Sequence, residues 1–130
     1  MASHFIWYEL ITSDLDAAIA FYGKVVGWSV QAGQQPGMDY RMIRAAETDI
    51  GGMMAAPDPA MPSAWFTYVD VADVDAEITA FEAAGGKAHW PANDLPGVGR
   101  MAMVSDPQGA QIYVMTPAVA GRTDSFNPAR

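Results

Sequence analysis

The chain has 130 residues, of which 51% are hydrophobic and 17% are charged, so it is long and apolar enough to bury a core. Seven Lys and Arg residues against 15 Asp and Glu residues give a net charge of −8, which would repel nucleic acid. Because cysteine is absent, the sequence excludes disulfides, thiol nucleophiles and iron–sulfur clusters.

The sequence shows no targeting or membrane segment. No window approaches the roughly 20 consecutive apolar residues that a membrane helix needs. The first residues lack a basic segment followed by an apolar run. We therefore expect a cytoplasmic protein that binds neither membranes nor nucleic acid.

An internal repeat organises the chain. Asp14-Leu15-Asp16-Ala17 returns as Asp73-Val74-Asp75-Ala76, and Gly27 returns as Gly86 at the same spacing. Pro36-Gly37 returns as Pro96-Gly97 with a spacing one residue longer. The repeat predicts a single domain, 1–130, built from a first module (5–56), a proline-rich linker (57–62), a second module (63–117) and a tail (118–130).

The first module begins with a strand over residues 5–11, which are rich in aromatic and β-branched side chains. Ser13 or Asp14 would cap a helix that ends at Gly27. Apolar residues at helical spacing give this helix one buried face: Leu15, Ala18, Ile19, Tyr22 and Val26. Three further strands are expected at 28–32, 40–46 and 51–56.

The second module repeats this order. A strand over 65–71 is followed by a helix that Asp73 would cap and that Gly85-Gly86 would end. Val74, Ile78 and Phe81 would form its apolar face. Strands are expected at 87–90, 100–105 and 110–115, and Asp106-Pro107-Gln108-Gly109 predicts a type I turn between the last two.

Two βαβββ modules predict an α+β fold. The open edges and apolar face of each four-stranded sheet would be hidden if the mixed sheets curled around a common cavity, with the helices outside. Whether the modules pair within one chain or between two chains stays open.

Several of these residues resemble a known family. The segment from Glu9 to Leu15, with Phe21-Tyr22 and Gly27-Trp28, resembles the first module of the vicinal oxygen chelate superfamily. This superfamily includes glyoxalase I, extradiol dioxygenases and the bleomycin- and fosfomycin-resistance proteins. Val98-Gly99-Arg100, with the Asp106–Gly109 turn, resembles the end of its second module. The resemblance covers residues 5–117 and implies the glyoxalase/bleomycin resistance-like fold and a homodimer.

The resemblance also implies where a metal ion would be held. Enzymes of this family bind a divalent metal with four side chains, one from the first and one from the last strand of each module. In this sequence those positions fall at Trp7, Met53, Phe66 and Tyr113, with Met54 as the neighbouring choice for the second. Such metals need imidazole nitrogen or carboxylate oxygen. We therefore expect a family member that lacks the metal ligands and uses no cofactor.

An aromatic cavity would remain where the metal site is lost. Trp7, Phe66, Tyr68 and Tyr113 should face one interior if strand alternation holds. Such rings suit a flat apolar or aromatic ligand, with Met53 beside them and Arg100 as a clamp for a ligand carboxylate or phosphate. The alternatives are that the rings fill a closed core and that Arg100 is only a solvated residue at a strand end.

Glu9 is the candidate catalytic residue. It has the same strand parity as Trp7, so it should point inward, and a buried carboxylate could act as a general base. The alternative is that Glu9 forms a structural ion pair with Arg41, Arg44 or Arg100.

These observations favour a protein that binds a small apolar or aromatic molecule in a metal-free cavity. One alternative is a metal-independent enzyme with Glu9 as its base. Another is a metal-dependent lyase or dioxygenase of the same superfamily. Whether the protein is an enzyme stays open at this stage.

Overall fold

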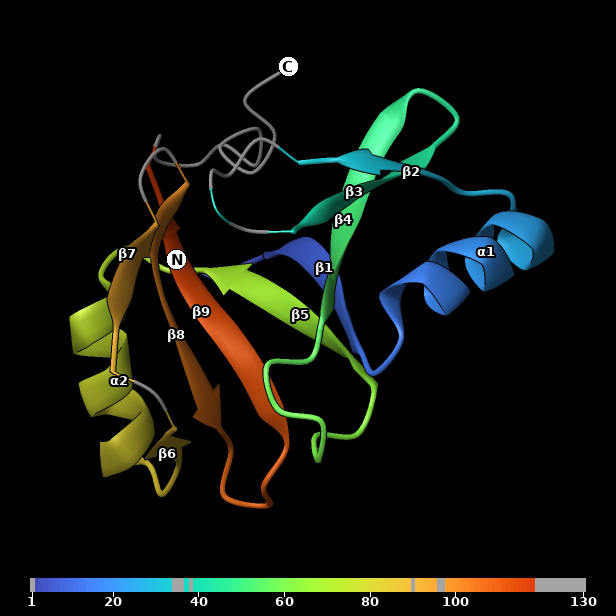
Figure 1. Ribbon diagram of the computed structural model, residues 1–130. Coiled ribbons are helices and arrows are strands. Elements are labelled where there is room, and N and C mark those ends of the chain that lie inside the picture. The colour runs from blue at the N-terminus through green and yellow to red at the C-terminus, as the bar shows by residue number, and fades with distance from the viewer. Residues whose placement is uncertain (1, 34–36, 38, 90, 96–97, 119–130) are drawn as a thin grey trace. The chain divides into compact units, whose positions relative to one another are not determined.

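The computed structural model describes residues 2–33, 37, 39–89, 91–95 and 98–118 (Figure 1). The chain divides into two compact units. We call residues Tyr8–Phe66 the α1 unit, and Met1–Trp7 together with the chain from Thr67 onward the α2 unit. Each unit combines one helix with a mixed sheet, which confirms the predicted α+β class. Three parts of the sequence predictions lie outside the described residues: the repeat matches at Pro36 and Pro96-Gly97, the strand end at Trp90, and the tail after residue 118.

The sheet of the α1 unit has the strand order β2-β3-β4-β1. Its strands are β1 (Phe5–Thr12, from Tyr8 on), β2 (Ser29–Ala32), β3 (Arg41–Ala45) and β4 (Thr48–Ala55). β1 runs parallel to β4, and the other neighbours are antiparallel. All four strands were predicted, but β4 begins three residues earlier than expected, because it pairs with β3 up to the tight turn that joins them.

Helix α1 (Leu15–Val26) follows the sequence prediction at both ends. The Asp14 carboxylate accepts a hydrogen bond from the Ala17 N–H at 3.0 Å, and Gly27 ends the helix with a left-handed φ of 76°. Most of the predicted apolar face is confirmed, since Leu15, Ala18, Ile19 and Tyr22 pack into the core. Val26 was predicted wrongly: it is 51% exposed, because the last turn extends beyond the sheet core.

The sheet of the α2 unit has the order β5-β9-β8-β6, and β7 also pairs with β8. The strands are β5 (Ala64–Asp70, from Thr67 on), β6 (Lys87–Ala88), β7 (Asn93–Leu95), β8 (Gly99–Ser105) and β9 (Gln111–Pro117). The predicted hairpin between β8 and β9 is confirmed: the Gly109 N–H donates to the Asp106 carbonyl at 3.0 Å. β7 was not predicted, because three residues without a β-branched side chain give no strand signal.

Helix α2 (Val74–Ala83) repeats the capping of α1. The Asp73 carboxylate accepts a hydrogen bond from the Ala76 N–H at 3.2 Å, as Asp14 does from Ala17. The repeat at these positions therefore has one physical meaning, a capped helix start. The predicted end of α2 at Gly85-Gly86 is also confirmed, although the left-handed residue is Gly85 (φ 96°) and not Gly86, which the repeat had matched with Gly27.

In each unit a core fills the space between the helix and one face of the sheet. The core residues beneath α1 are Leu10, Leu15, Ile43 and Met53, and those beneath α2 are Val71, Val74, Ala102, Val104 and Val114. Strand alternation then assigns Glu9 and Gly52 to the other face of the α1-unit sheet, and Tyr113 and Met115 to the other face of the α2-unit sheet. No helix of the described residues is long and apolar enough to cross a membrane.

Candidate functional site

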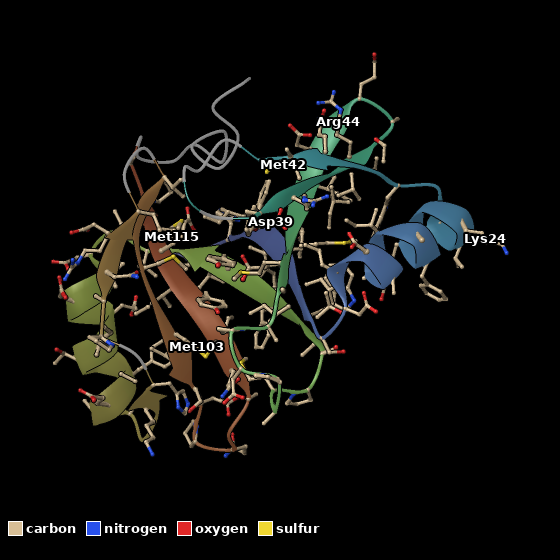
Figure 2. All side chains as sticks on the ribbon, in the orientation of Figure 1. Lys24, Asp39, Met42, Arg44, Met103 and Met115 are labelled. Carbon is tan, nitrogen blue, oxygen red and sulfur yellow. The ribbon has the colours of Figure 1, made fainter. Side chains whose placement is uncertain are left out.

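A row of large side chains crosses the α2-unit sheet on the face away from α2. Tyr68 on β5 pairs with Tyr113 on β9, which pairs with Met103 on β8, so the three lie side by side. The two tyrosine rings stack with centroids 4.4 Å apart and planes only 8° apart. All three residues are buried, and Met115 lies two residues beyond Tyr113 on β9. Figure 2 labels Met103 and Met115 on these two neighbouring strands. This face is therefore aromatic and sulfur-rich, with low polarity.

The structure thus brings together two of the four predicted aromatic residues, Tyr68 and Tyr113. Trp7 belongs to the same unit and is 3% exposed, whereas Phe66 is the last residue of the α1 unit and is half-buried. That all four rings face one interior stays a prediction.

Glu9 is buried in the α1 unit, with 4% of its surface exposed. The Tyr40 hydroxyl donates a hydrogen bond to Glu9 Oε1 at 2.9 Å. Gly52 lies beside Glu9 in the register of β1 and β4, and a Cβ atom at Gly52 would fall on the Tyr40 ring. The ring can therefore reach the carboxylate only because Gly52 has no side chain.

Sequence reasoning missed Tyr40, because it precedes β3 and its reach across β4 depends on the pairing of the strands. The signal that could have suggested such a contact is the Gly51-Gly52 pair inside a strand. A glycine there often marks a place where another group approaches the backbone closely.

The three arginines considered as partners of Glu9 each bind aspartates. Arg41 contacts Asp39 at 2.6 Å, and Arg44 contacts the buried Asp49 at 3.2 Å. The Arg41 hydrogen bond holds the pKa of the Asp39 carboxyl below its usual value. Both arginines belong to β3, and each ion pair holds its side chain beside this strand. The register of β3 with β4 shifts between Ile43 and Arg44.

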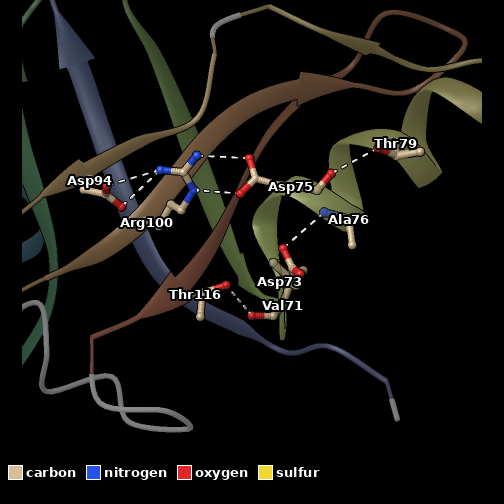
Figure 3. Close-up of polar contacts among 8 residues, drawn as sticks. All are labelled: Val71, Asp73, Asp75, Ala76, Thr79, Asp94, Arg100 and Thr116. Atoms are coloured by element: carbon tan, nitrogen blue, oxygen red, sulfur yellow. Dashed lines mark hydrogen bonds and ion pairs between the residues drawn. The ribbon is translucent and has the colours of Figure 1, made fainter.

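Arg100 forms a network on the helix side of the α2 unit (Figure 3). Its Nε and Nη2 atoms donate to the two oxygens of Asp75, each at 3.0 Å, and Nη1 donates to Asp94 at 3.2 Å. The hydrogen bonds lower the pKa of Asp75 and, chiefly through Asp75, raise the pKa of Arg100. Arg100 therefore joins β8 to both α2 and β7. The sequence had suggested a ligand clamp or a solvated residue at a strand end, and not this structural network.

Met53 lies on the helix-covered face of its sheet. It is fully buried in the core beneath α1, and its register partner on β1 is Leu10. Its neighbour Met54, the other choice at this position, has the strand parity of Glu9 and Gly52. Of the two methionines, Met54 is thus the one on the Glu9 face.

The residues present do not fit a divalent metal site of the family's kind. The expected ligand positions carry two apolar rings, a thioether and a phenol, none of which replaces imidazole or carboxylate. Among the residues that the structure describes, no group of three or more His, Cys, Asp or Glu side chains could hold a metal ion.

Comparison with known proteins gives the family directly. Residues 4–114 match the family described as Glyoxalase/Bleomycin resistance protein/Dioxygenase superfamily. A protein of Mycobacterium bovis named "Putative glyoxylase CFP32" is 42% identical over 114 residues, which cover 87% of this chain and 44% of that protein. The "Anthracycline biosynthesis protein DnrV" of Streptomyces peucetius is 30% identical over 128 residues, covering 87% of this chain and 46% of that protein. The chain thus spans less than half the length of these relatives.

Solved structures agree on the fold. A methylmalonyl-CoA epimerase of Streptomyces coelicolor superposes with a TM-score of 0.63 at 15% identity, covering 90% of this chain and 96% of that one. The epimerase of Mycobacterium tuberculosis gives a TM-score of 0.59 at 18% identity, covering 88% and 87%. Together with the family match, which spans both βαβββ modules, these similarities confirm the resemblance seen in the sequence. The chain belongs to the Glyoxalase/Bleomycin resistance protein/Dioxygenase superfamily.

Proposed function

We propose that this protein binds a small, flat apolar or aromatic molecule without the help of a metal ion. One sequence feature carries the proposal: by the family resemblance, the positions that hold the metal in the family's enzymes fall on Trp7, Phe66, Tyr113 and a methionine. The methionine is Met53 or its neighbour Met54, of which Met54 lies on the Glu9 face. Replacing nitrogen and oxygen donors by rings and a thioether removes the affinity for a hard cation and adds apolar surface. The change therefore favours a ligand that gains free energy from ring stacking and desolvation.

The stacked pair Tyr68–Tyr113, with Met103 beside it, supports this ligand class. Parallel rings and a thioether offer flat, polarisable surfaces, and the two phenol oxygens add polar atoms to this face. Two relatives at 30% identity are named for anthracycline biosynthesis, and anthracyclines are flat polycyclic aromatic molecules. We propose a molecule of that general shape as the ligand.

A thermal-unfolding screen with hydroxylated anthraquinones tests the proposal, because a ligand that prefers the native state raises the unfolding temperature. Tyr68→Phe keeps the ring and should bind within about threefold of the parent, whereas Tyr68→Leu should bind at least tenfold more weakly. Phe21→Leu, on the exposed side of α1, is the matched control and should bind normally. Equal binding by Tyr68→Leu would contradict the role of this face.

The same screen distinguishes metal-free binding from a metal-dependent function. Repeating it after treatment with EDTA should leave the affinity unchanged. If the unfolding shift disappears with EDTA and returns with Mn²⁺ or Ni²⁺, the metal-dependent lyase or dioxygenase becomes the better interpretation and this proposal fails.

The Tyr40–Glu9 contact favours a second candidate, a metal-independent enzyme. A buried carboxylate that accepts a hydrogen bond from a phenol hydroxyl could accept a proton from a carbon acid. Methylmalonyl-CoA, named in several structural neighbours, is a practical probe for deuterium exchange in heavy water. Exchange that Glu9→Gln abolishes, with the fold intact, would favour the enzyme; no exchange and unchanged ligand binding would favour the binder.

The predicted homodimer also becomes a proposal. Exposed large apolar residues provide surface for such contact: Phe5, Tyr8, Phe21, Val25, Val26 and Trp65. Sedimentation velocity across a hundredfold concentration range should give the mass of two chains; the mass of one chain throughout would refute it.

A further inference from the structure

A second aromatic cluster lies in the α1 unit, on the helix side of its sheet. Tyr22 stacks on Trp28 with ring centroids 5.4 Å apart, and Trp65 stands nearly perpendicular to both rings, at 82° to Tyr22 and 75° to Trp28. The indole N–H of Trp65 donates to the Tyr22 hydroxyl at 3.2 Å. The rings of Trp28 and Trp65 are therefore held in a fixed corner.

This corner forms part of a pocket of about 310 Å³, which is lined by Tyr8, Trp28, Ile43, Ile50, Gly51 and Trp65. Three aromatic side chains form its sides, and the remaining lining is aliphatic or glycine. Trp65 is 41% exposed and Tyr8 is 47% exposed, so ring surface is accessible from solvent. None of the predicted ligand-binding residues lines this pocket, and all six lining residues belong to the α1 unit.

The chemistry of the lining limits the ligand. Among the described residues, those that line the pocket include no basic side chain that could pair with an anion, while the whole chain carries a net charge of −8 that attracts cations. Aromatic ring faces bind organic cations through their negative quadrupole, and Trp gives the strongest effect. Inorganic cations would find no carboxylate or amide oxygen on these side chains, whereas a methylated ammonium also buries its apolar groups against the rings.

We infer that this pocket is a binding site for a compact organic cation, such as a quaternary ammonium group. The near-perpendicular indoles of Trp28 and Trp65 receive the cation in their corner, and Tyr8 provides a third ring. Because the Trp65–Tyr22 hydrogen bond already fixes the corner, binding requires little ordering of side chains. The site is separate from the one used in the proposed function.

Titration with choline tests the inference, with tryptophan fluorescence as the readout and ionic strength held constant. The neutral isostere 3,3-dimethyl-1-butanol has the same shape without the charge, and it should bind at least tenfold more weakly. If both compounds bind equally, the pocket is only hydrophobic and the inference is wrong. Absence of saturable binding to choline would also overturn it.

Two variants localise the binding. Trp65→Leu removes one side of the corner and should weaken choline binding at least tenfold; its thermal unfolding shows whether the fold is kept. Trp65→Phe keeps a ring face and should retain binding within a few-fold, so it remains informative if the leucine variant is unstable. Phe5→Leu, at a more exposed aromatic position outside the pocket, should bind like the parent. Loss of binding in Phe5→Leu or retention in Trp65→Leu would contradict the site.

Discussion

The contact between Glu9 and Tyr40 shows how a single missing side chain shapes a site. Gly52 leaves room for the Tyr40 ring over β4, and the ring in turn brings its hydroxyl within 2.9 Å of the carboxylate. Strand parity in the sequence was sufficient to place Glu9 on an inward face. It was insufficient to identify the partner of Glu9. That partner, Tyr40, lies 31 residues away at the start of a predicted strand whose neighbours the sequence did not specify.

Gly52→Ala should destabilise the protein by about 1–3 kcal/mol, because the added methyl group overlaps the Tyr40 ring and overpacks the site. Urea unfolding measures the change. Gly23→Ala is the matched control: its Cβ would meet only the Trp28 carbonyl at 3.4 Å, and alanine favours the helix by up to about 1 kcal/mol. Equal effects at the two glycines would show that Tyr40 does not occupy the space above Gly52.

Tyr40→Phe tests the hydrogen bond itself. Removing the hydroxyl takes one donor from a buried carboxylate, and we expect a loss of about 1–3 kcal/mol in the free energy of unfolding. In combination with Glu9→Gln, the double-mutant cycle should give a coupling energy above about 0.5 kcal/mol. Additive effects of the two substitutions would show that the groups do not interact.

Among whole elements, the two helices give the strongest agreement between sequence and structure. Asp14 and Asp73 were matched by the repeat and both cap a helix with the same hydrogen bond. Capping depends on residues three positions apart, so a single sequence contains all the information. β7 depends on its pairing with β8, which follows it in the chain, and the sequence did not predict it. Distant pairing also decides the position of Met53. It lies on the helix-covered face of its sheet because β4 pairs with β1 so that Met53 is beside Leu10.

Asp73→Ala should cost about 1 kcal/mol of unfolding free energy, because the Ala76 N–H loses its acceptor at the start of α2. Asp73→Asn should recover much of this loss, since asparagine also caps helices. The two variants, compared by urea unfolding, separate capping from the general effect of removing one negative charge. A loss as large in the asparagine variant would point to charge as the cause.

The Arg100 network predicts a pH dependence for the α2 unit. The native pKa of Asp75 is lowered, so its ion pair stabilises the protein above the ordinary carboxyl pKa and the contribution is lost as pH falls through the lowered value. Arg100→Gln should therefore be less stable than the parent at neutral pH, and the difference should shrink in acid. NMR titration should show the pKa of Asp75 rising toward its ordinary value in the variant. A stability difference that is constant down to the acid transition would contradict this linkage.

For the whole molecule, the sequence predicted the family and the order of both helices and of every strand except β7, because a repeat and several local motifs mark them. It could not predict which side chains meet in a site. The second aromatic cluster, for example, joins Tyr22 of α1, Trp28 before β2 and Trp65 of β5. Residues this far apart in sequence meet only through the sheet. Composition nevertheless gave one property that needs no structure, the excess of acidic groups.

The excess of acidic over basic residues predicts how the stability of the molecule responds to salt. A net charge of −8 produces repulsion that opposes the compact state, and added salt screens it over about 8–10 Å near 0.1 M. Salt also weakens the exposed Arg41–Asp39 and Arg100–Asp75 pairs, but such pairs contribute little. The unfolding temperature should therefore rise between about 20 and 200 mM NaCl at pH 7. Arg100→Gln increases the net negative charge by one and removes an ion-pair network, so its unfolding temperature should rise more steeply. A falling unfolding temperature in the parent would mean that the ion pairs, and not the net charge, dominate its electrostatics.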